Sequence, residues 1–563
     1  MLAERLLRVI ESQPEAIAIR DFQMGDITYS KLWELLKSSS NAIDKIFKTE
    51  KYIGIVADQD AYAVIAYMAV MLTGRVIVPI DPRHDAKLIE QMLEPFTSKV
   101  ICGLEINFRT ILNTVSPKDV VGSKSTNYYF RTENSDTYIL HTSGTTGMAK
   151  PVLADQAALK HVADALAKKY HVTPRSRVLQ FAYLSFDSSL IEIWGTLFGG
   201  GTIVIAGKKL REDLYGCIEG LLTSQQITSV TLPPSVASGI RDECLRNLDT
   251  LILAGDECPT ELANRLYKHI PHLINAYGPT ESIVCATTFE IHERQESRVP
   301  IGMPLLGMEV IISNPDSNGY GEMILVSSYL AKGYARDELR TSKKFSIKDG
   351  GRLYYRSGDI GRVRSDGQYE FLGRIDNQVK ISGQRIELEG IEAQIRKITK
   401  RNDVAVVAVS NKLYGLYVSK THLSEFDDLT ASLMTSLPSY AIPKSYLPIN
   451  VMPLDLNGKI DRKALKLLVL GTRPLVEIVP RESDEQHEKI ISLWAKSLGI
   501  SQDNIHSNSG FFSLGGDSLG ALKLVKAVND YYGTNLRLSE VIADPATPAS
   551  MLETVEKHKT GKW

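Results

Sequence analysis

The chain has 563 residues, of which 43% are hydrophobic and 23% charged, which indicates a globular protein with roughly three or four folding units. Its formal net charge of −1 excludes nucleic acid and anionic membranes as expected partners. Both are polyanions, and a chain with almost no net charge offers them no electrostatic attraction. The cysteines lie far apart, which indicates a reducing compartment and gives no metal-site spacing. They are Cys102, Cys217, Cys244, Cys258 and Cys285.

Neither a secretory signal nor a membrane span is predicted. Residues 1–5 lack a basic region followed by an apolar core. The longest apolar stretch, residues 63–72, has about half the length that a membrane span needs. We therefore expect a cytoplasmic protein with no membrane partner.

The first half of the chain alternates between strand-like and helical patterns. Residues 52–56 and 75–80 are strand-like and enclose the helical stretch 61–72, which favours a layered βαβ arrangement. Residues 200–205 and 251–255 are predicted to be buried strands, because their apolar residues run without alternation.

A stretch rich in Ser, Thr and Gly follows the apolar run 138–141. Its glycines would let backbone N–H groups approach oxygen atoms closely, while its hydroxyls and its Lys add donors and charge, a mixture that suits a polyphosphate. The spacing disfavours a Walker-type loop, and a flexible surface loop is the alternative for the stretch taken alone. Its residues are Thr142, Ser143, Gly144, Thr145, Thr146, Gly147, Met148, Ala149 and Lys150.

The second half of the chain changes in character from about residue 320, where short strands and turns replace the alternation. A small α+β unit is predicted to begin after Gly373. Residues 474–483 hold two prolines and mixed charges without periodicity and are interpreted as a linker. Residues 484–556 are predicted to be helical.

Four further stretches fit chemistry on a nucleotide. Residues 275–281 place an aromatic ring, a tight turn and a carboxylate together, which suits a nucleobase and Mg²⁺. Residues 355–359 offer a carboxylate for ribose hydroxyls, residues 373–380 form a polar turn that could act as a hinge, and residues 457–462 present a Lys on a turn. Each stretch alone is more readily a structural turn.

In this order and spacing, the five stretches closely resemble the adenylation domains of nonribosomal peptide synthetases, within the adenylate-forming enzyme superfamily. Residues 27–29, 74–82 and 321–334 match further motifs of that family. The resemblance implies a multidomain α/β fold with a large adenylate-forming core of layered βαβ sheets, a small α+β lid and an all-α four-helix carrier bundle. The expected boundaries are 1–373 for the core, 374–470 for the lid, 471–483 for a linker, 484–556 for the carrier and 557–563 for a tail.

The resemblance also implies two half-reactions that use ATP, Mg²⁺ and 4′-phosphopantetheine. An amino-acid carboxylate would attack the α-phosphate of ATP to give an aminoacyl adenylate and pyrophosphate, and a thiol would then displace AMP. The first step needs a cation beside the phosphate, and the second needs that cation withdrawn. A lid that rotates about a hinge can serve both steps.

The residue roles are carried over by the same resemblance. Lys459 would bridge the substrate carboxylate and ATP, Tyr277 would stack on adenine, Asp359 would bind ribose, Glu281 would hold Mg²⁺ and Asp376 would be the hinge. The expected catalytic residues are Lys459, Thr142 and Glu281. The expected ATP-binding residues are Thr142, Ser143, Gly144, Thr145, Thr146, Gly147, Lys150, Asn275, Ala276, Tyr277, Gly278, Thr280, Asp359, Arg374 and Lys459.

Two positions depart from the family pattern. Pro151 follows Lys150 where the family has Gly, which fixes φ and removes an N–H. Ser382 stands where the family has Arg, which removes one positive charge near the expected thiol path. Neither departure removes an essential group, and the sequence leaves open whether turnover is slower or ATP binding weaker.

The expected substrate is a large aromatic amino acid. Asp187 would pair with the substrate ammonium; the alternative is a helix N-cap before residues 190–197. The expected lining resembles that of the phenylalanine-activating domains of gramicidin and tyrocidine synthetases, with Ile191 in place of Trp, so phenylalanine or tyrosine is favoured, with room for a ring-substituted or tryptophan-sized side chain. The substrate-binding residues are Asp187, Ser188, Ile191, Thr231, Ile252, Ala254, Ala276, Val284, Cys285 and Lys459.

The C-terminal unit resembles a peptidyl carrier protein. Ser518 lies in a Gly-Gly-Asp-Ser-Leu run that opens a helix ending near Tyr532, where Gly533 stops it. An exposed helix N-terminus favours a phosphodiester, so Ser518 is the expected attachment residue for 4′-phosphopantetheine; an ordinary N-cap Ser is the alternative.

The expected partners are an amino acid, a phosphopantetheinyl transferase, and a condensation domain or tailoring enzyme acting in trans, since no condensation or thioesterase region is recognised. Two alternatives stay open. One is an acyl- or aryl-CoA ligase of the same superfamily, and the other is a non-catalytic protein in which only the carrier is active.

Overall fold

The computed structural model describes most of the chain. The described residues are 1–106, 108, 113–121, 128, 130, 135–142, 149–207, 214–348, 351–375, 378–381, 383–409, 412–419, 426, 429–454, 460–471, 485–498, 500, 502, 505, 511, 518–534, 536 and 547–560. The chain divides into two compact units, Met1–Arg462 and Lys463–Trp563.

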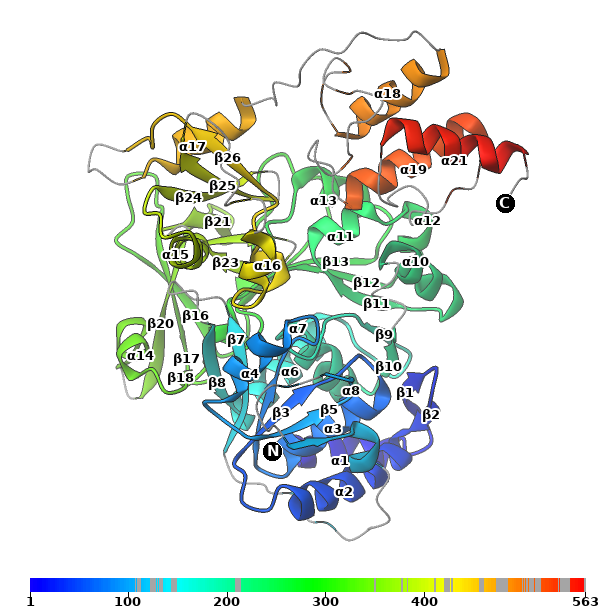
Figure 1. The fold of residues 1–563 in the computed structure, drawn as a ribbon. Helices are drawn as coiled ribbons and strands as arrows, with labels where there is room; N and C mark the ends of the chain where they lie inside the picture. Colours follow the sequence, from blue (N-terminus) through cyan, green and yellow to red (C-terminus); the bar gives the residue numbers. More distant parts are fainter. Residues whose placement is uncertain are drawn as a thin grey trace. The chain divides into compact units, whose positions relative to one another are not determined.

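The first unit contains a seven-stranded sheet in the order β18-β8-β7-β4-β3-β5-β6. Figure 1 labels β18, β8, β7, β3 and β5 of this sheet. Strands β3 to β7 pair in parallel, whereas β8 and β18 are antiparallel additions at one edge. The strands are β3 (Tyr52–Val56), β4 (Val76–Pro79), β5 (Lys99–Cys102), β6 (Asn113–Val115), β7 (Asp136–Thr142), β8 (Lys150–Asp155) and β18 (Gly333–Tyr334). The predicted βαβ arrangement is confirmed, since α3 (Ala61–Leu72) connects the parallel strands β3 and β4.

A nine-stranded sheet has the order β15-β14-β13-β12-β11-β9-β10-β1-β2. Its strands are β1 (Ile17–Asp21), β2 (Gly25–Thr28), β9 (Arg177–Gln180), β10 (Thr202–Ile205), β11 (Ser229–Leu232), β12 (Thr250–Ala254), β13 (His272–Tyr277), β14 (Thr287–Glu290) and β15 (Met303–Pro304). The strands predicted near residues 200 and 251 are confirmed. Ile252 faces one hydrophobic cluster while its neighbours Leu251 and Leu253 face another, which is why the apolar run has no alternation.

Helices cover the faces of both sheets. They are α1 (Leu2–Ser12), α2 (Tyr29–Ile46), α4 (Ala86–Leu93), α5 (Pro117–Val121), α6 (Gln156–Lys169), α7 (Ser188–Leu190), the π-helical turn η1 (Ile191–Gly195), α8 (Thr196–Gly199), α10 (Leu214–Ser224), α11 (Pro234–Gly239), α12 (Asp242–Leu245), α13 (Thr260–Leu266) and η2 (Thr280–Ser282). Helix α3 is apolar because it is buried on nearly every side. Among the described residues, no helix combines the length and apolar character needed to cross a membrane.

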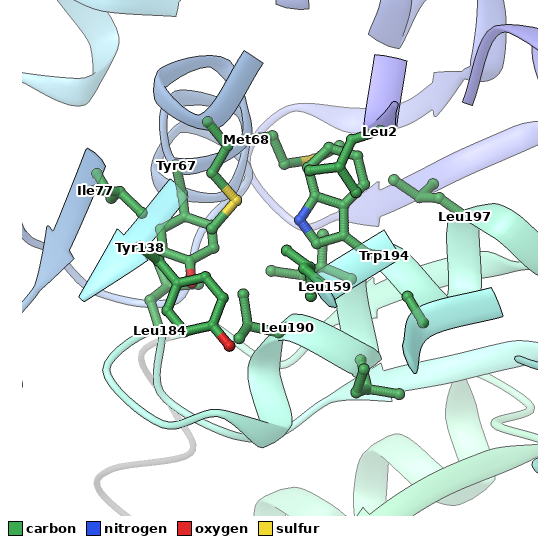
Figure 2. Packing of buried hydrophobic residues seen from close by; sticks show 14 of the residues in the cluster. Leu2, Tyr67, Met68, Ile77, Tyr138, Leu159, Leu184, Leu190, Trp194 and Leu197 are labelled. Carbon is green, nitrogen blue, oxygen red and sulfur yellow. The ribbon is translucent and has the colours of Figure 1, made fainter. Parts of the chain in front are cut away.

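The main hydrophobic cluster joins the two sheets beneath the segment that carries Asp187. It takes residues from β3, β4 and β7 of one sheet and from β10, β12 and β13 of the other. Figure 2 shows part of this cluster, with Leu2, Tyr67, Met68, Ile77, Tyr138, Leu159, Leu184, Leu190, Trp194 and Leu197 labelled. Leu184 and Leu190 bracket Asp187 in the sequence, so their burial fixes the loop between them.

Two smaller sheets and a hairpin complete the first unit. The third sheet contains β16 (Met308–Ser313), β17 (Gly321–Ser327), β19 (Phe345–Lys348), β20 (Arg352–Val363) and β21 (Tyr369–Arg374), with α14 (Glu338–Lys344) beside it. The predicted α+β lid contains the hairpin β22 (Gln378–Ile381) and β23 (Gln384–Glu387), followed by α15 (Leu388–Thr399), β24 (Val404–Val409), β25 (Lys412–Val418), α16 (Leu429–Met434), η4 (Ser439–Ala441) and β26 (Ser445–Ile449).

The second unit is helical where it is described, as predicted. Its described helices are α17 (Arg462–Gly471), which belongs to this unit from Lys463 onward, α18 (Glu485–Leu498), α19 (Ser518–Tyr532) and α21 (Pro548–Thr560). A separate core includes Trp494, Val525 and Val528, of which the last two lie on the buried face of α19. Gly533, at φ 66°, ends that helix where the sequence placed its end.

Candidate active site

The Ser/Thr/Gly stretch joins two neighbouring antiparallel strands. β7 ends at Thr142 and β8 begins at Lys150, and these two residues are paired across the strands. The intervening residues Ser143, Gly144, Thr145, Thr146 and Gly147 lie outside the described residues. Thr142 Oγ1 is buried and has no hydrogen-bond partner in the described part of the chain, so it is available to a ligand's oxygen atom.

Lys150 is buried and forms an ion pair with the carboxylate of Glu387. Glu387 is the last residue of β23 in the lid hairpin. Burial lowers the pKa of Lys150, and the nearby Glu387 carboxylate opposes that shift. The Lys that was predicted to bind phosphate is therefore held by a carboxylate from the lid.

Glu281 is fully buried in η2, directly after β13. Arg385 Nη1 lies 3.0 and 3.3 Å from its two carboxylate oxygens, and the Tyr334 hydroxyl donates to it at 2.7 Å. Burial alone would raise the pKa of Glu281, but the Arg385 guanidinium and the Tyr334 hydroxyl lower that pKa to about 2. The carboxylate is thus ionised and is occupied by a cation of the lid hairpin.

Tyr277 and Asp359 lie together, although 82 residues separate them. The Tyr277 hydroxyl donates to Asp359 Oδ2 at 2.5 Å, and Arg374 forms an ion pair with the same carboxylate. Asp359 and Arg374 are cross-strand partners in β20 and β21, so the sheet register sets this pair. Tyr277, which is expected to stack on adenine, and Asp359, which is expected to bind ribose, therefore belong to one buried hydrogen-bond network.

Asn275 and Gly278 have local structural contacts. Asn275 Nδ2 donates to the carbonyl of Pro300 at 2.7 Å. A Cβ atom on Gly278 would lie 2.5 Å from Cys285 Cα, so only glycine fits at this turn.

Asp187 is partly buried and accepts a hydrogen bond of 2.7 Å from Thr280 Oγ1. It precedes α7 but makes no side-chain capping bond, so the alternative N-cap role is not supported. Burial raises the pKa of Asp187, and the Thr280 hydroxyl opposes that shift. This side chain therefore connects the segment after β9 with the turn after β13.

Four of the predicted lining residues lie on one face of three neighbouring strands. Thr231 of β11 is paired with Ile252 of β12, and Ala254 of β12 is paired with Ala276 of β13. Ile252 and Ala254 are two residues apart, so the four side chains share a face.

The remaining lining residues come from irregular backbone. Ile191 begins the π-helical turn, directly after α7, which contains Ser188. Val284 has φ 74° and precedes the buried Cys285, and Ile283 before it has φ 59°. Left-handed β-branched residues are strained, and both this strain and π-turns concentrate at functional sites. This backbone sets the positions of Ile191, Val284 and Cys285.

The lid hairpin brings in charged residues that sequence reasoning did not place in the site. Besides Arg385 and Glu387, Lys380 of β22 interacts electrostatically with Asp359, Asp256 and Asp187. Gly383 N, at the tip of the hairpin, donates to Asp256 Oδ2 at 2.7 Å. Local sequence gives no signal for these contacts except the alternation of charged and apolar residues along the hairpin.

A cavity of about 60 Å³ lies where β4 and β7 end. Core residues that line it include Pro79, His84 and Thr142, and the lid contributes Ile386 and Tyr440. The carboxyl edge of a parallel sheet is the usual place for a ligand in such folds. Lys459 and Asp376 lie outside the described residues, and Ser518 is the first residue of α19 in the second unit.

The architecture is that of an adenylate-forming enzyme followed by a carrier region. The holo form of a nonribosomal peptide synthetase protein containing adenylation and PCP domains, solved with a vinylsulfonamide inhibitor, matches with a TM-score of 0.81 and 25% identity, over 99% of this chain and 96% of that chain. The family model described as AMP-binding enzyme matches residues 6–335, and the model described as phosphopantetheine attachment site matches residues 488–555.

The chain belongs to the AMP-binding enzyme family, in the adenylation–carrier arrangement of nonribosomal peptide synthetases. Tyrocidine synthase 1 of Brevibacillus parabrevis is 30% identical over 92% of this chain, which spans 50% of that protein. Bacitracin synthase 3 of Bacillus licheniformis is 32% identical over 95% of this chain, which spans 9% of that protein. The chain therefore covers half or less of these relatives' length.

Proposed function

We propose that this protein activates an amino acid as an aminoacyl adenylate and loads it as a thioester onto a 4′-phosphopantetheine arm at Ser518. The observation that carries the proposal is the Asp187 carboxylate, which Thr280 holds in the turn after β13, one of the three strands that carry the expected lining residues. A partly buried carboxylate next to apolar walls supplies the countercharge that a substrate ammonium needs. A fatty or aryl acid has no ammonium to offer this carboxylate.

The first half-reaction joins a carboxylate oxygen to the α-phosphorus of ATP and breaks the bond to pyrophosphate. We assign Thr142 and Lys150 to the phosphates, Asp359 to ribose, Tyr277 to adenine and Lys459 to the bridge between substrate and ATP. The unpartnered Thr142 Oγ1 fits an oxygen-rich ligand.

The second half-reaction forms a carbon–sulfur bond at the adenylate carbonyl and releases AMP. The observed lid position suits this step. Arg385 of the lid is paired with Glu281, and Glu387 of the lid is paired with Lys150, so two groups assigned to the first step are already engaged. The Glu281 carboxylate fits Mg²⁺, which prefers oxygen ligands and, when bound, would neutralise phosphate charge. Since Arg385 takes both carboxylate oxygens, we propose that the lid must move before Mg²⁺ can bind. The cavity lined by His84 and Ile386 is the proposed path of the thiol arm.

Lys459→Ala separates the two half-reactions. We expect loss of ATP–pyrophosphate exchange, with a much smaller effect on thioester formation from preformed adenylate. Asp461→Asn, two residues further along the chain, is the matched control. Equal losses in both assays for Lys459→Ala would contradict the assigned role.

We propose phenylalanine or tyrosine as the substrate, with room for a ring-substituted or tryptophan-sized side chain. The small Ala254 and Ala276 leave volume on the shared strand face, and Ile191 is smaller than an indole. Pyrophosphate exchange with all twenty amino acids tests this. Preference for alanine, aspartate or lysine would contradict it.

The proposed organisation keeps the boundaries 1–373, 374–470, 471–483 and 484–556 for core, lid, linker and carrier. A phosphopantetheinyl transferase would modify Ser518, and a condensation domain or tailoring enzyme would accept the aminoacyl group. The five cysteines are all free thiols, which supports a reducing, cytoplasmic location.

A further inference from the structure

A cluster of imidazole and carboxylate groups lies at the amino end of β13, opposite the end that leads to Glu281. The strand runs from His272 to Tyr277, so its two ends are about 17 Å apart. His171, His272 and Glu290 each offer one ligand atom, and these atoms all lie within 4.8 Å of one another. None of these residues has a part in the proposed adenylation chemistry.

The strand register brings part of this cluster together. Ile274 of β13 is paired with Glu290 of β14, and Ile291 N donates to the carbonyl of Leu273 at 2.7 Å. The same antiparallel register places His292 opposite His272. Because side chains alternate along a strand, His272, Glu290 and His292 face the same side of the ladder.

His171 approaches from the turn that follows α6, about 100 residues earlier in the chain. Its backbone has φ 53°, and its ring stacks on that of His272 with centroids 3.6 Å apart and planes 13° apart. The distances to Glu290 are 3.3 Å from His171 Nε2, 2.6 Å from His272 Nδ1 and 3.8 Å from His292 Nε2. Separate segments thus converge on one carboxylate.

The donor set and its spacing suit a transition metal. Tetrahedral Zn²⁺ with bonds of about 2.0–2.1 Å places neighbouring ligand atoms roughly 3.3–3.4 Å apart. The distance from His171 Nε2 to Glu290 is already 3.3 Å, and a rotation of Glu290 would open the shorter contact to His272. One of the two stacked imidazole rings must also turn out of the stack, so that both nitrogen lone pairs point at the ion. Two nitrogen donors disfavour Mg²⁺, which prefers oxygen ligands.

We propose that His171, His272 and Glu290 bind a divalent transition-metal ion of the Zn²⁺ class, with His292 within reach of the fourth position. The ion would connect the turn after α6 to the β13–β14 ladder. At its other end this ladder holds Asn275, Ala276 and Tyr277, so the ion would stiffen the support of the candidate active site. The side chains are 30–38% exposed, which provides an entry path.

Titration of the chelator-treated, untagged full chain with ZnCl₂ tests the site by calorimetry. We expect one saturable Zn²⁺ per chain, no displacement by excess Mg²⁺ and a higher Tm with Zn²⁺. The double variant His171→Ala/His272→Ala should weaken binding by at least about 100-fold, since even outer-shell changes cost about 10–100-fold. His269→Ala, in the exposed turn before β13, is the matched control and should bind as the unmodified chain does.

A second measurement needs no variant. X-ray absorption of the Zn²⁺-loaded, unmodified chain should show a nitrogen and oxygen shell with at least two imidazoles and no sulfur. Three results would each overturn the proposal: no saturable Zn²⁺, a sulfur-containing shell, or unchanged affinity in a folded double variant.

Discussion

The two ends of β13 each have a glutamate nearby, and the two carboxylates have opposite surroundings. Glu281, beyond the carboxyl end, is fully buried and is held by Arg385 and Tyr334. Glu290, beside the amino end, is 30% exposed and is surrounded by imidazoles. The pKa of Glu281 falls to about 2 despite burial, and that of Glu290 is lowered as its contacts with His272 and His171 outweigh burial.

This contrast shows how surroundings decide what a carboxylate can do. At the buried end the carboxylate needs a cationic partner, which is Arg385 in this structure. The proposed exchange of Arg385 for Mg²⁺ would couple lid position to chemistry. At the exposed end water screens the charge of the carboxylate. The first arrangement suits a two-state mechanism, and the second suits reversible binding of an ion.

The largest expected effect is at the buried end. Glu281→Gln removes the proposed Mg²⁺ ligand and leaves Arg385 without its countercharge. We expect the rate of ATP–pyrophosphate exchange to fall by about 10²–10³-fold, the range for loss of one preorganised electrostatic group. Glu309→Gln, which breaks an exposed pair with Arg352, is the control. A rate of exchange in Glu281→Gln near that of the unmodified chain would contradict the proposed role of Glu281 in adenylation.

Asp187→Asn tests whether Asp187 is the countercharge of the substrate ammonium. Loss of the countercharge should raise KM for the amino acid by about 100-fold, in the range for a charge-assisted contact, while KM for ATP stays the same. Activation of 3-phenylpropanoate, which lacks the ammonium, should not be weakened. An equal loss with both acids would show that Asp187 acts through folding alone.

The contribution of Glu281 to the free energy of unfolding should depend on pH. The pKa of Glu281 is lowered from 4.5 to about 2 in the folded chain, worth about 3 kcal/mol. This contribution is complete well above pH 4.5 and is lost as the pH falls towards 2. The difference in unfolding free energy between the unmodified chain and Glu281→Gln, from denaturant titrations, should therefore shrink from pH 7 to pH 3. A constant difference would contradict the assigned pKa.

The smallest expected effect is at the exposed end. In metal-free buffer, Glu290→Gln should change the unfolding free energy by at most about 1 kcal/mol, since exposed pairs contribute little. The change should decrease further in high salt. A loss as large as that for Glu281→Gln would end the distinction between the two ends.

The sequence predicted the parts of this molecule that depend on local pattern. The apolar run at Leu251–Leu253 identified a strand buried on both faces, and Gly533 marked the end of α19. Family motifs indicated Asp187 and Glu281 as functional residues. Their bonds to Thr280 and to Arg385 required the folded chain, because each contact joins segments about 90–100 residues apart.

The contacts that sequence reasoning missed are all long-range. Glu387 and Lys150 are 237 positions apart, and nothing in either segment indicates the other. The histidine cluster depends on the β13–β14 register, since a slip of one residue would turn Glu290 away from His272. Its third member, His171, depends on a left-handed turn that no local residue preference predicts.

The most direct measurement is the intact mass of the pantetheinylated chain after incubation with ATP, Mg²⁺ and each of the twenty amino acids. We expect an ATP-dependent gain of one aminoacyl group, greatest with phenylalanine or tyrosine and absent in Ser518→Ala. No gain with any amino acid, on a chain that carries the pantetheine arm, would contradict it.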